Sequence, residues 1–182
     1  MKGIVFNLLE EVTRRKHGER VWDTVLETAR VDGAYTSVGQ YPDADFLKLL
    51  ATTATVLKLP PDEVVRWLGT QALPLLARRF PAFFSPHKST RAFLLTLNGL
   101  VQSEVHKLYP GAEVPEFTCD NSAPEALTLT YRSKRRLCAL AEGLIYGTAT
   151  HYREVVRLEH PLCMKRKDKC CVFRLAFLGK GG

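Results

Sequence analysis

The sequence lacks any long apolar run, because no stretch approaches the roughly 18 consecutive apolar residues of a membrane-spanning helix. A signal peptide is not expected either, since Glu10 and Glu11 interrupt the amino terminus before an apolar core develops. We therefore expect a cytoplasmic protein that does not associate with membranes. Hydrophobic residues make up 46% of the 182 positions, enough to bury the core of one domain spanning residues 1–182.

Catalytic signatures are also missing from the sequence. It contains no glycine-rich phosphate-binding loop, no nucleophile in a motif that pairs it with a base, and no pair of acidic residues in a motif typical of a cleft. These absences argue against an enzyme and favour a sensor or a binding domain.

Charge and cysteine content narrow the choice further. The formal charge of +7 is compatible with nucleic-acid binding, but the basic residues are scattered, apart from a run at 165–169 that is typical of a hairpin turn. Nucleic acid is therefore the weakest of the candidate partners. Five cysteines without a signal peptide argue against a disulfide scaffold, because the cytosol keeps thiols reduced. They direct attention to metal or redox chemistry.

The first 110 residues show helical periodicity, with apolar residues three and four positions apart. The predicted helices span 4–15, 21–30, 43–57, 61–77 and 90–109. The fourth has a good start, because Pro61 suits a first turn and Asp62 and Glu63 lie near the positive end of the helix dipole. The segment 80–86 contains two prolines and is predicted to be a break.

After Pro115 the pattern changes to an alternation with period two, which predicts a strand at 126–133. A helix at 136–152 follows, and then two strands at 155–159 and 170–178 joined by the basic turn. The predicted fold class is α+β, with a helical amino-terminal part packed on an antiparallel sheet crossed by helices.

Tyr131, Ser133 and Arg135 are alternate residues at the end of the first predicted strand, so they can present their side chains on one face. Arginine offers a planar, bidentate fork of donors, and the two hydroxyls add neutral donors. This set suits a carboxylate or phosphate. A strand end can also carry Ser and Arg for solubility alone, so the spacing leaves both interpretations open.

These three residues, with the opening segment 1–7, the segments 104–109 and 135–144, and Pro115, resemble the haem nitric oxide/oxygen-binding (H-NOX) family. That family includes the sensor region of soluble guanylate cyclase. The resemblance covers essentially the whole chain. It implies a four-stranded antiparallel sheet, a helical lobe at 1–60, and a lobe at 61–182 with the haem pocket and the sheet. It also implies that Tyr131, Ser133 and Arg135 bind the haem propionates and that Pro115 distorts the macrocycle.

The iron-binding histidine of the family lies thirteen residues before that proline, a position that Gln102 occupies here. A carboxamide oxygen is a much weaker iron ligand than an imidazole, so we expect haem b to bind more loosely. Three explanations stay open: a haem-poor branch of the family, a weak-ligand sensor, or an engineered substitution. His106 is an alternative ligand only if the haem shifts by about 6 Å, the rise of four helical residues.

On the distal side of the haem, the resemblance places Leu140 where oxygen-holding members carry a tyrosine. The other distal residues it implies are also apolar, namely Val5, Leu9, Ala72, Leu76 and Leu144. Without a donor for bound dioxygen, a haem here should prefer nitric oxide or carbon monoxide.

Four residues have the ligand types and spacing of a zinc site: Cys138, His160, Cys163 and Cys171. We expect His160 and Cys163 on one turn, Cys171 on the next strand and Cys138 on the neighbouring helix. Cys171 is preferred to Cys170 because it shares a face with inward apolar residues. Unrelated core cysteines are the alternative. The resemblance adds that some bacterial H-NOX proteins carry zinc in this arrangement.

The resemblance to stand-alone bacterial members implies a haem-based nitric oxide sensor that acts in trans on a histidine kinase or a cyclic-di-nucleotide enzyme. Loss of the iron–histidine bond is the signal in the family, so a chain with Gln102 is expected to mimic the signalling state. A haem-independent thiol/zinc redox sensor is the alternative, because oxidation of the thiolates would release zinc. A nucleic-acid-binding module is the third.

Overall fold

The computed structural model describes residues 1–100, 103 and 105–181. Gln102, the predicted position of the iron ligand, lies outside the described residues. The helices are α1 (Gly3–His17), α2 (Glu19–Ala29), α3 (Asp43–Leu57), α4 (Pro61–Arg79), α5 (Pro81–Phe84), α6 (Thr90–Leu100), α7 (His106–Leu108) and α8 (Cys138–His151). The strands are β1 (Glu116–Asp120), β2 (Ala126–Arg132), β3 (Glu154–Leu162) and β4 (Cys171–Lys180), with a short 3-10 helix, η2 (Met164–Arg166), between β3 and β4.

The four strands form one antiparallel sheet in the order β1-β2-β4-β3. The predicted α+β class with a four-stranded antiparallel sheet is therefore confirmed. In the register of β2 and β4, Leu127 lies opposite Leu175 and Leu129 opposite Phe173. All four side chains are buried, so the alternation that predicted the strand at 126–133 places one face of the sheet in the core.

The helices of the first 100 residues begin and end close to the predicted positions, with two differences. The segment 80–86, predicted as a break, contains the single-turn helix α5, which Pro81 starts at its first position. The helix predicted over 90–109 corresponds, in the described part of the chain, to α6 and the short α7. Strand β1 was missed, because five residues with polar ends give too little alternation to detect. None of the described helices is long and apolar enough to span a bilayer.

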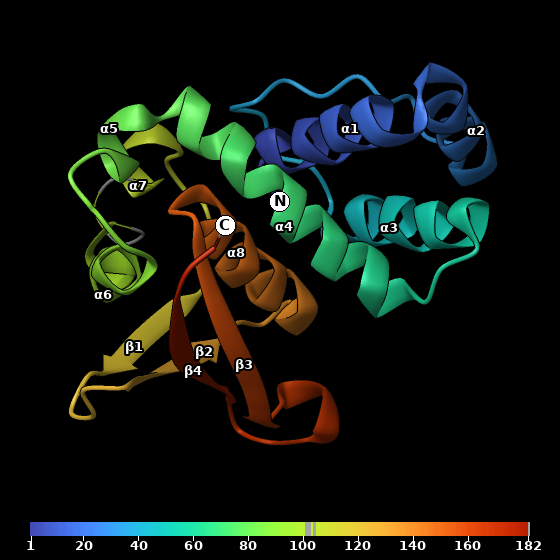
Figure 1. Cartoon of the computed structure of the whole chain (residues 1–182). Coiled ribbons are helices and arrows are strands. Elements are labelled where there is room, and N and C mark those ends of the chain that lie inside the picture. The colour runs from blue at the N-terminus through green and yellow to red at the C-terminus, as the bar shows by residue number, and fades with distance from the viewer. Residues whose placement is uncertain (101–102, 104, 182) are drawn as a thin grey trace.

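Buried apolar side chains form two clusters that meet at α4. One cluster joins α6, α8 and the inner face of the sheet, while the other joins α1, α2 and α3. Leu76 of α4 packs against both clusters. Figure 1 shows α1, α2 and α3 gathered at one end of α4, with α6 and the sheet toward the other side. The position of α4 therefore sets how the two clusters face each other.

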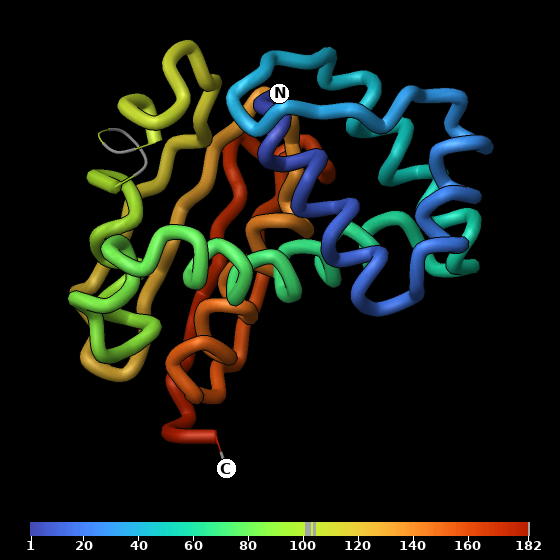
Figure 2. The backbone as a smooth tube through the Cα atoms, turned by 90° about the horizontal axis from the view of Figure 1, so that it is seen from above, coloured from blue at the N-terminus to red at the C-terminus, as the bar shows by residue number. Residues whose placement is uncertain are grey.

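Helix α4 crosses α8, as the view from above shows (Figure 2), and the two backbones approach each other closely at two glycines. A Cβ atom added to Gly69 would lie 2.6 Å from the backbone oxygen of Leu140, and one added to Gly143 would clash with the backbone oxygen of Arg66. Each glycine thus occupies a place where the opposite backbone leaves no room for a side chain. This contact fixes the distance between the two helices.

Replacing Gly143 with alanine is expected to lower the free energy of unfolding by about 1–3 kcal/mol, because overpacking forces the two helices apart. Gly99→Ala is the matched control, since Gly99 is an exposed residue of α6 with open space around its Cα. The control should be stabilised by about 0.5–1 kcal/mol through its higher helix propensity. Urea unfolding of both variants measures the difference, and equal changes in both would show that the crossing is not constrained.

Candidate functional site

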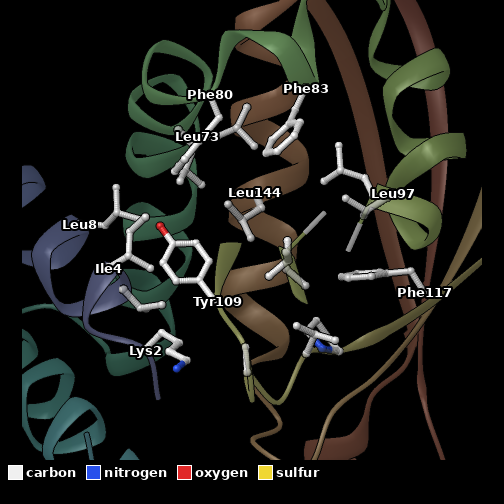
Figure 3. A pocket seen from close by; sticks show the side chains of 18 of the residues that line it. Lys2, Ile4, Leu8, Leu73, Phe80, Phe83, Leu97, Tyr109, Phe117 and Leu144 are labelled. Atoms are coloured by element: carbon white, nitrogen blue, oxygen red, sulfur yellow. The ribbon is translucent and has the colours of Figure 1, made fainter. Parts of the chain in front are cut away.

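A largely apolar cavity of about 360 Å³ lies between α1, α4, α6, α8 and β1. Figure 3 shows that Leu73 of α4 and Leu144 of α8 contribute to its wall, together with Leu97 of α6 and Phe117 of β1. The guanidinium-bearing Arg135 lies at its margin, where it also borders a polar depression. A large apolar group with acidic substituents at one edge fits this combination of wall and charge.

Five of the residues predicted to contact haem contribute to the cavity wall. They are Val5, Leu76, Pro115, Arg135 and Leu144. Three predicted distal residues lie outside the wall and in the apolar cluster of the amino-terminal helices. They are Leu9, Ala72 and Leu140. Leu9 and Ala72 are buried there, and the backbone of Leu140 meets Gly69 at the helix crossing.

Tyr109 is a cavity residue that the sequence analysis did not single out. Its ring lies in the wall and its hydroxyl points into the cavity (Figure 3). Burial raises the pKa of the phenol, which therefore remains a hydrogen-bond donor at neutral pH. Tyr109 follows the end of α7 and directly precedes Pro110, so helical periodicity does not assign its side chain to the cavity. The described wall thus includes a neutral phenol donor that the prediction of an apolar distal side did not contain.

Tyr131, Ser133 and Arg135 come together, but not as alternate residues of one strand. Strand β2 ends at Arg132, and a turn follows in which Arg136 donates its amide to the carbonyl of Ser133. The strand-based prediction is therefore wrong for Arg135. The turn achieves the proximity instead, because the Arg135 amide lies 3.3 Å from Ser133 Oγ.

Tyr131 lies deeper than the other two residues of this group. It is buried between Phe117 and Phe173 and does not belong to the cavity wall among the described residues. Burial raises the pKa of its phenol to about 12, although a hydrogen bond with the Ser133 side chain acts in the opposite direction. Tyr131 therefore supports Ser133 from behind rather than from the cavity surface.

Arg135 is held by carboxylates of the chain itself. Its Nε lies 2.6 Å from Asp43 Oδ2, and its Nη1 lies 2.7 Å from the backbone oxygen of Glu113. Asp43 also forms an ion pair with the Met1 amine, whose nitrogen lies 2.8 Å from Asp43 Oδ1. Burial alone would raise the pKa of Asp43, but the hydrogen bonds from the amine and from Arg135 hold it below its usual value. One guanidinium thus joins the start of α3 to the cavity margin.

His106 borders the polar depression beside Ser133 and Arg135 rather than the apolar cavity. The cavity wall, as far as the structure describes it, contains no histidine. The geometry of the described residues therefore does not favour His106 as a substitute iron ligand.

Three cysteines form a compact group within the apolar cluster that joins α6, α8 and the inner face of the sheet. The sulfurs of Cys138, Cys163 and Cys171 all lie within 4.8 Å of one another, and Cys138 and Cys171 are 3.1 Å apart. They come from the start of α8, the residue before η2 and the start of β4. All three are buried, and burial raises the pKa of the Cys138 and Cys171 thiols. A soft dication would displace the protons of such thiols.

His160, the fourth predicted ligand, stands apart from the three sulfurs. It lies in β3 rather than in the turn where we expected it, because β3 continues to Leu162. Its Nδ1 lies 2.5 Å from Glu142 Oε1, and its ring packs on Phe173. Its Nε2 is buried and has no hydrogen-bond partner among the described residues. Cys170 is half-buried and lies outside the cluster.

Zinc fits this donor set. Three thiols and one imidazole with a free nitrogen are typical of a closed, tetrahedral structural site. A buried nitrogen without a hydrogen-bond partner is costly in the absence of a ligand, so the Nε2 atom of His160 also points to a metal.

Replacing Asp43 with asparagine is expected to reduce stability by less than about 1 kcal/mol at pH 7, because its half-exposed ion pairs are screened by solvent. The pKa of Asp43 is lower in the folded chain, so its stabilisation is present above the unfolded value of about 4. That stabilisation is lost as the pH falls through the folded value. Asp45→Asn, in the same helix turn, controls for the helix dipole. Urea unfolding at pH 7 and at successively lower pH should show a deficit that shrinks as Asp43 is protonated in the folded chain; a deficit of equal size at every pH would contradict it.

The comparisons with known proteins agree with this geometry. The family described as Haem-NO-binding matches residues 2–160. The soluble guanylate cyclase gcy-31 of Caenorhabditis elegans is 26% identical over 151 residues, which are 75% of this chain. The chain spans only 20% of the length of that relative.

Solved structures show the same fold. An H-NOX protein from S. oneidensis in the Fe(II)NO ligation state superposes with a TM-score of 0.92 and 28% identity, covering 98% of this chain and 100% of that chain. A histidine-to-glycine mutant of a Shewanella oneidensis H-NOX domain in the Fe(II)CO ligation state gives a TM-score of 0.88 and 27% identity, covering 98% of this chain and 99% of that chain. The chain therefore belongs to the H-NOX family of haem-based gas-sensor domains.

Proposed function

We propose that this chain is a nitric oxide sensor domain whose haem is anchored weakly because Gln102 stands at the ligand position. The observation that carries the proposal is the apolar cavity with Arg135 at its margin. H-NOX domains are sensors and not catalysts, so the output belongs to another protein or domain. As that output we propose a histidine kinase or a cyclic-di-nucleotide enzyme acting in trans.

Several features of the cavity support haem as the bound group. Pro115 lies in the wall, where it can press on a macrocycle, and Arg135 can pair with a propionate. Ser133 lies beside Arg135 at the polar margin. Leu100 and Val105, the nearest described wall residues on either side of Gln102, both face the cavity. When bound, haem would supply the iron that ligates the gas.

Nitric oxide is the gas that the comparisons favour. The Shewanella protein of the same fold is described with nitric oxide on iron(II), and the matching family is named for that gas. The histidine-to-glycine mutant with carbon monoxide on iron(II) supports retention of haem by this fold after loss of a histidine. The family assignment therefore favours haem sensing over the haem-independent thiol/zinc redox alternative, which has only the cysteine cluster behind it.

Signalling by this chain is proposed to be constitutive. In a family whose signal is loss of the iron–histidine bond, a chain without that histidine starts in the conformation that the bond would otherwise prevent. We propose that the chain consists of a helical lobe at 1–60 and a cavity and sheet lobe at 61–182. The signalling and resting conformations would differ in the arrangement of these two lobes.

The variant Gln102→His is expected to bind haem more tightly and to show a ferrous spectrum that differs from that of the wild type, because imidazole is the stronger iron ligand. Gln71→His, whose new imidazole would lie outside the cavity, is the control and should behave as the wild type. Haem titration followed by absorption spectra of the ferrous and nitrosyl forms measures both effects. Identical spectra for the wild type and Gln102→His would exclude position 102 as the ligand site.

We further propose that Cys138, Cys163 and Cys171, with His160, bind one structural zinc ion. The mutual approach of the three buried sulfurs supports this site. Zinc would replace the thiol protons and join the start of α8, the end of β3 and the start of β4. Its proposed role is to stabilise the sheet and α8, since a closed tetrahedral site leaves no position open for a substrate.

Zinc at about 100 times its dissociation constant is expected to stabilise the fold by about 2.7 kcal/mol, a rise of roughly 5–10 °C in the unfolding midpoint. Cys171→Ser should abolish the rise, because it removes one of the buried sulfurs. Cys170→Ser changes the neighbouring thiol outside the cluster and should keep it. Thermal unfolding with and without a chelator, together with metal analysis, provides the measurement. A wild-type chain without bound zinc, or equal losses in the two variants, would refute the site.

A further inference from the structure

A chain of hydrogen-bonded polar side chains connects β3, α8 and α4. Glu142 of α8 accepts Arg66 Nε at 2.6 Å on one carboxylate oxygen, and His160 Nδ1 lies 2.5 Å from the other. Arg66 belongs to α4 and His160 to β3. The two contacts use both oxygens of a single carboxylate.

Glu142 is 7% exposed, which is unusual for an ionisable side chain and requires partners that compensate its burial. Arg66 supplies a charge, and its guanidinium extends from the place where α4 passes over Gly143. Glu142 also lies four residues after Cys138, so one face of α8 presents both a thiol of the cluster and this carboxylate. The carboxylate is thereby placed beside the proposed zinc site rather than elsewhere in the core.

The contact with Glu142 determines which nitrogen of His160 is available. A carboxylate accepts hydrogen bonds, so Nδ1 carries the hydrogen that it donates to Glu142. The lone pair of the neutral ring is then on Nε2, the atom that is buried without a partner among the described residues. Histidine ligands of metals typically donate their second nitrogen to a carboxylate in this way, which fixes the tautomer and the orientation of the ring.

We propose that Glu142 is a positioning residue that holds His160 with Nε2 free to become the fourth ligand of the zinc, and that Arg66 fixes this carboxylate from α4. The proposal rests on the zinc site proposed above. The ring lies outside the sulfur group, so coordination brings Nε2 toward the three sulfurs while Nδ1 keeps its carboxylate. Through Arg66 the metal site reaches α4, the helix that also lines the apolar cavity.

The test compares Glu142→Ala, Glu142→Gln and His160→Ala with the wild type, using the whole chain loaded with zinc. Glu142→Ala should bind zinc about 10–100-fold more weakly, the usual effect of losing a partner of a histidine ligand, and should therefore transfer zinc faster to an excess of a chromogenic chelator. Glu142→Gln should show a smaller acceleration, because its amide oxygen still accepts the Nδ1 hydrogen. Glu159→Gln is the matched control, since Glu159 precedes His160 and is exposed. It should release zinc at the wild-type rate.

Cobalt(II) provides a readout that a loss of stability alone would not change. The visible bands of the cobalt-loaded Glu142→Ala variant should shift toward those of His160→Ala, because both variants lose the oriented imidazole. Wild-type release rates together with wild-type cobalt bands in both Glu142 variants would overturn the proposal. Glu142→Gln keeps the shape of the side chain, so it decides the question if the alanine variant fails to fold. A wild-type chain that takes up neither zinc nor cobalt would refute the zinc site itself, which is a different result.

Discussion

The close crossing of α4 and α8 is the constraint on which the other features depend. Glycines at the crossing let the two backbones touch, so α4 lies far enough into the molecule to belong to both apolar clusters. Leu73 of α4 and Leu144 of α8 then face the same cavity. On the opposite side of the crossing, Arg66 reaches Glu142. A larger distance between α4 and α8 would both open the cavity and break the ion pair between Arg66 and Glu142.

Arg135 connects the cavity to the amino-terminal helices in a different way. Its guanidinium forms an ion pair with Asp43, the first residue of α3. Asp43 also forms an ion pair with the Met1 amine. An acidic group of a cofactor that takes the same fork of donors competes with Asp43 for it. Asp43 would then keep the amine and lose the guanidinium. Occupancy of the cavity and the attachment of α3 are therefore linked through a single side chain.

Much of the fold could be predicted from the sequence, because long periodic segments such as 43–57 and 61–77 carry their own signal. Strand β1 and the turn after Arg132 could not, since a short strand and a left-handed Arg136 leave no periodic pattern. The cysteine cluster followed from ligand types and spacing. The contact between His160 and Glu142 did not, because nothing in the sequence shows that residues 18 positions apart share a hydrogen bond.

The weak ligand proposed at position 102 would change the relative importance of the remaining contacts. An iron–imidazole bond anchors a cofactor from one side and tolerates imperfect contacts elsewhere. Without it, retention of haem would depend on the apolar wall and on Arg135, whose Nε is already held by Asp43. Under the proposed function, the affinity of this chain for haem would therefore depend on the ion pairs at the start of α3 more strongly than in a relative with a histidine ligand.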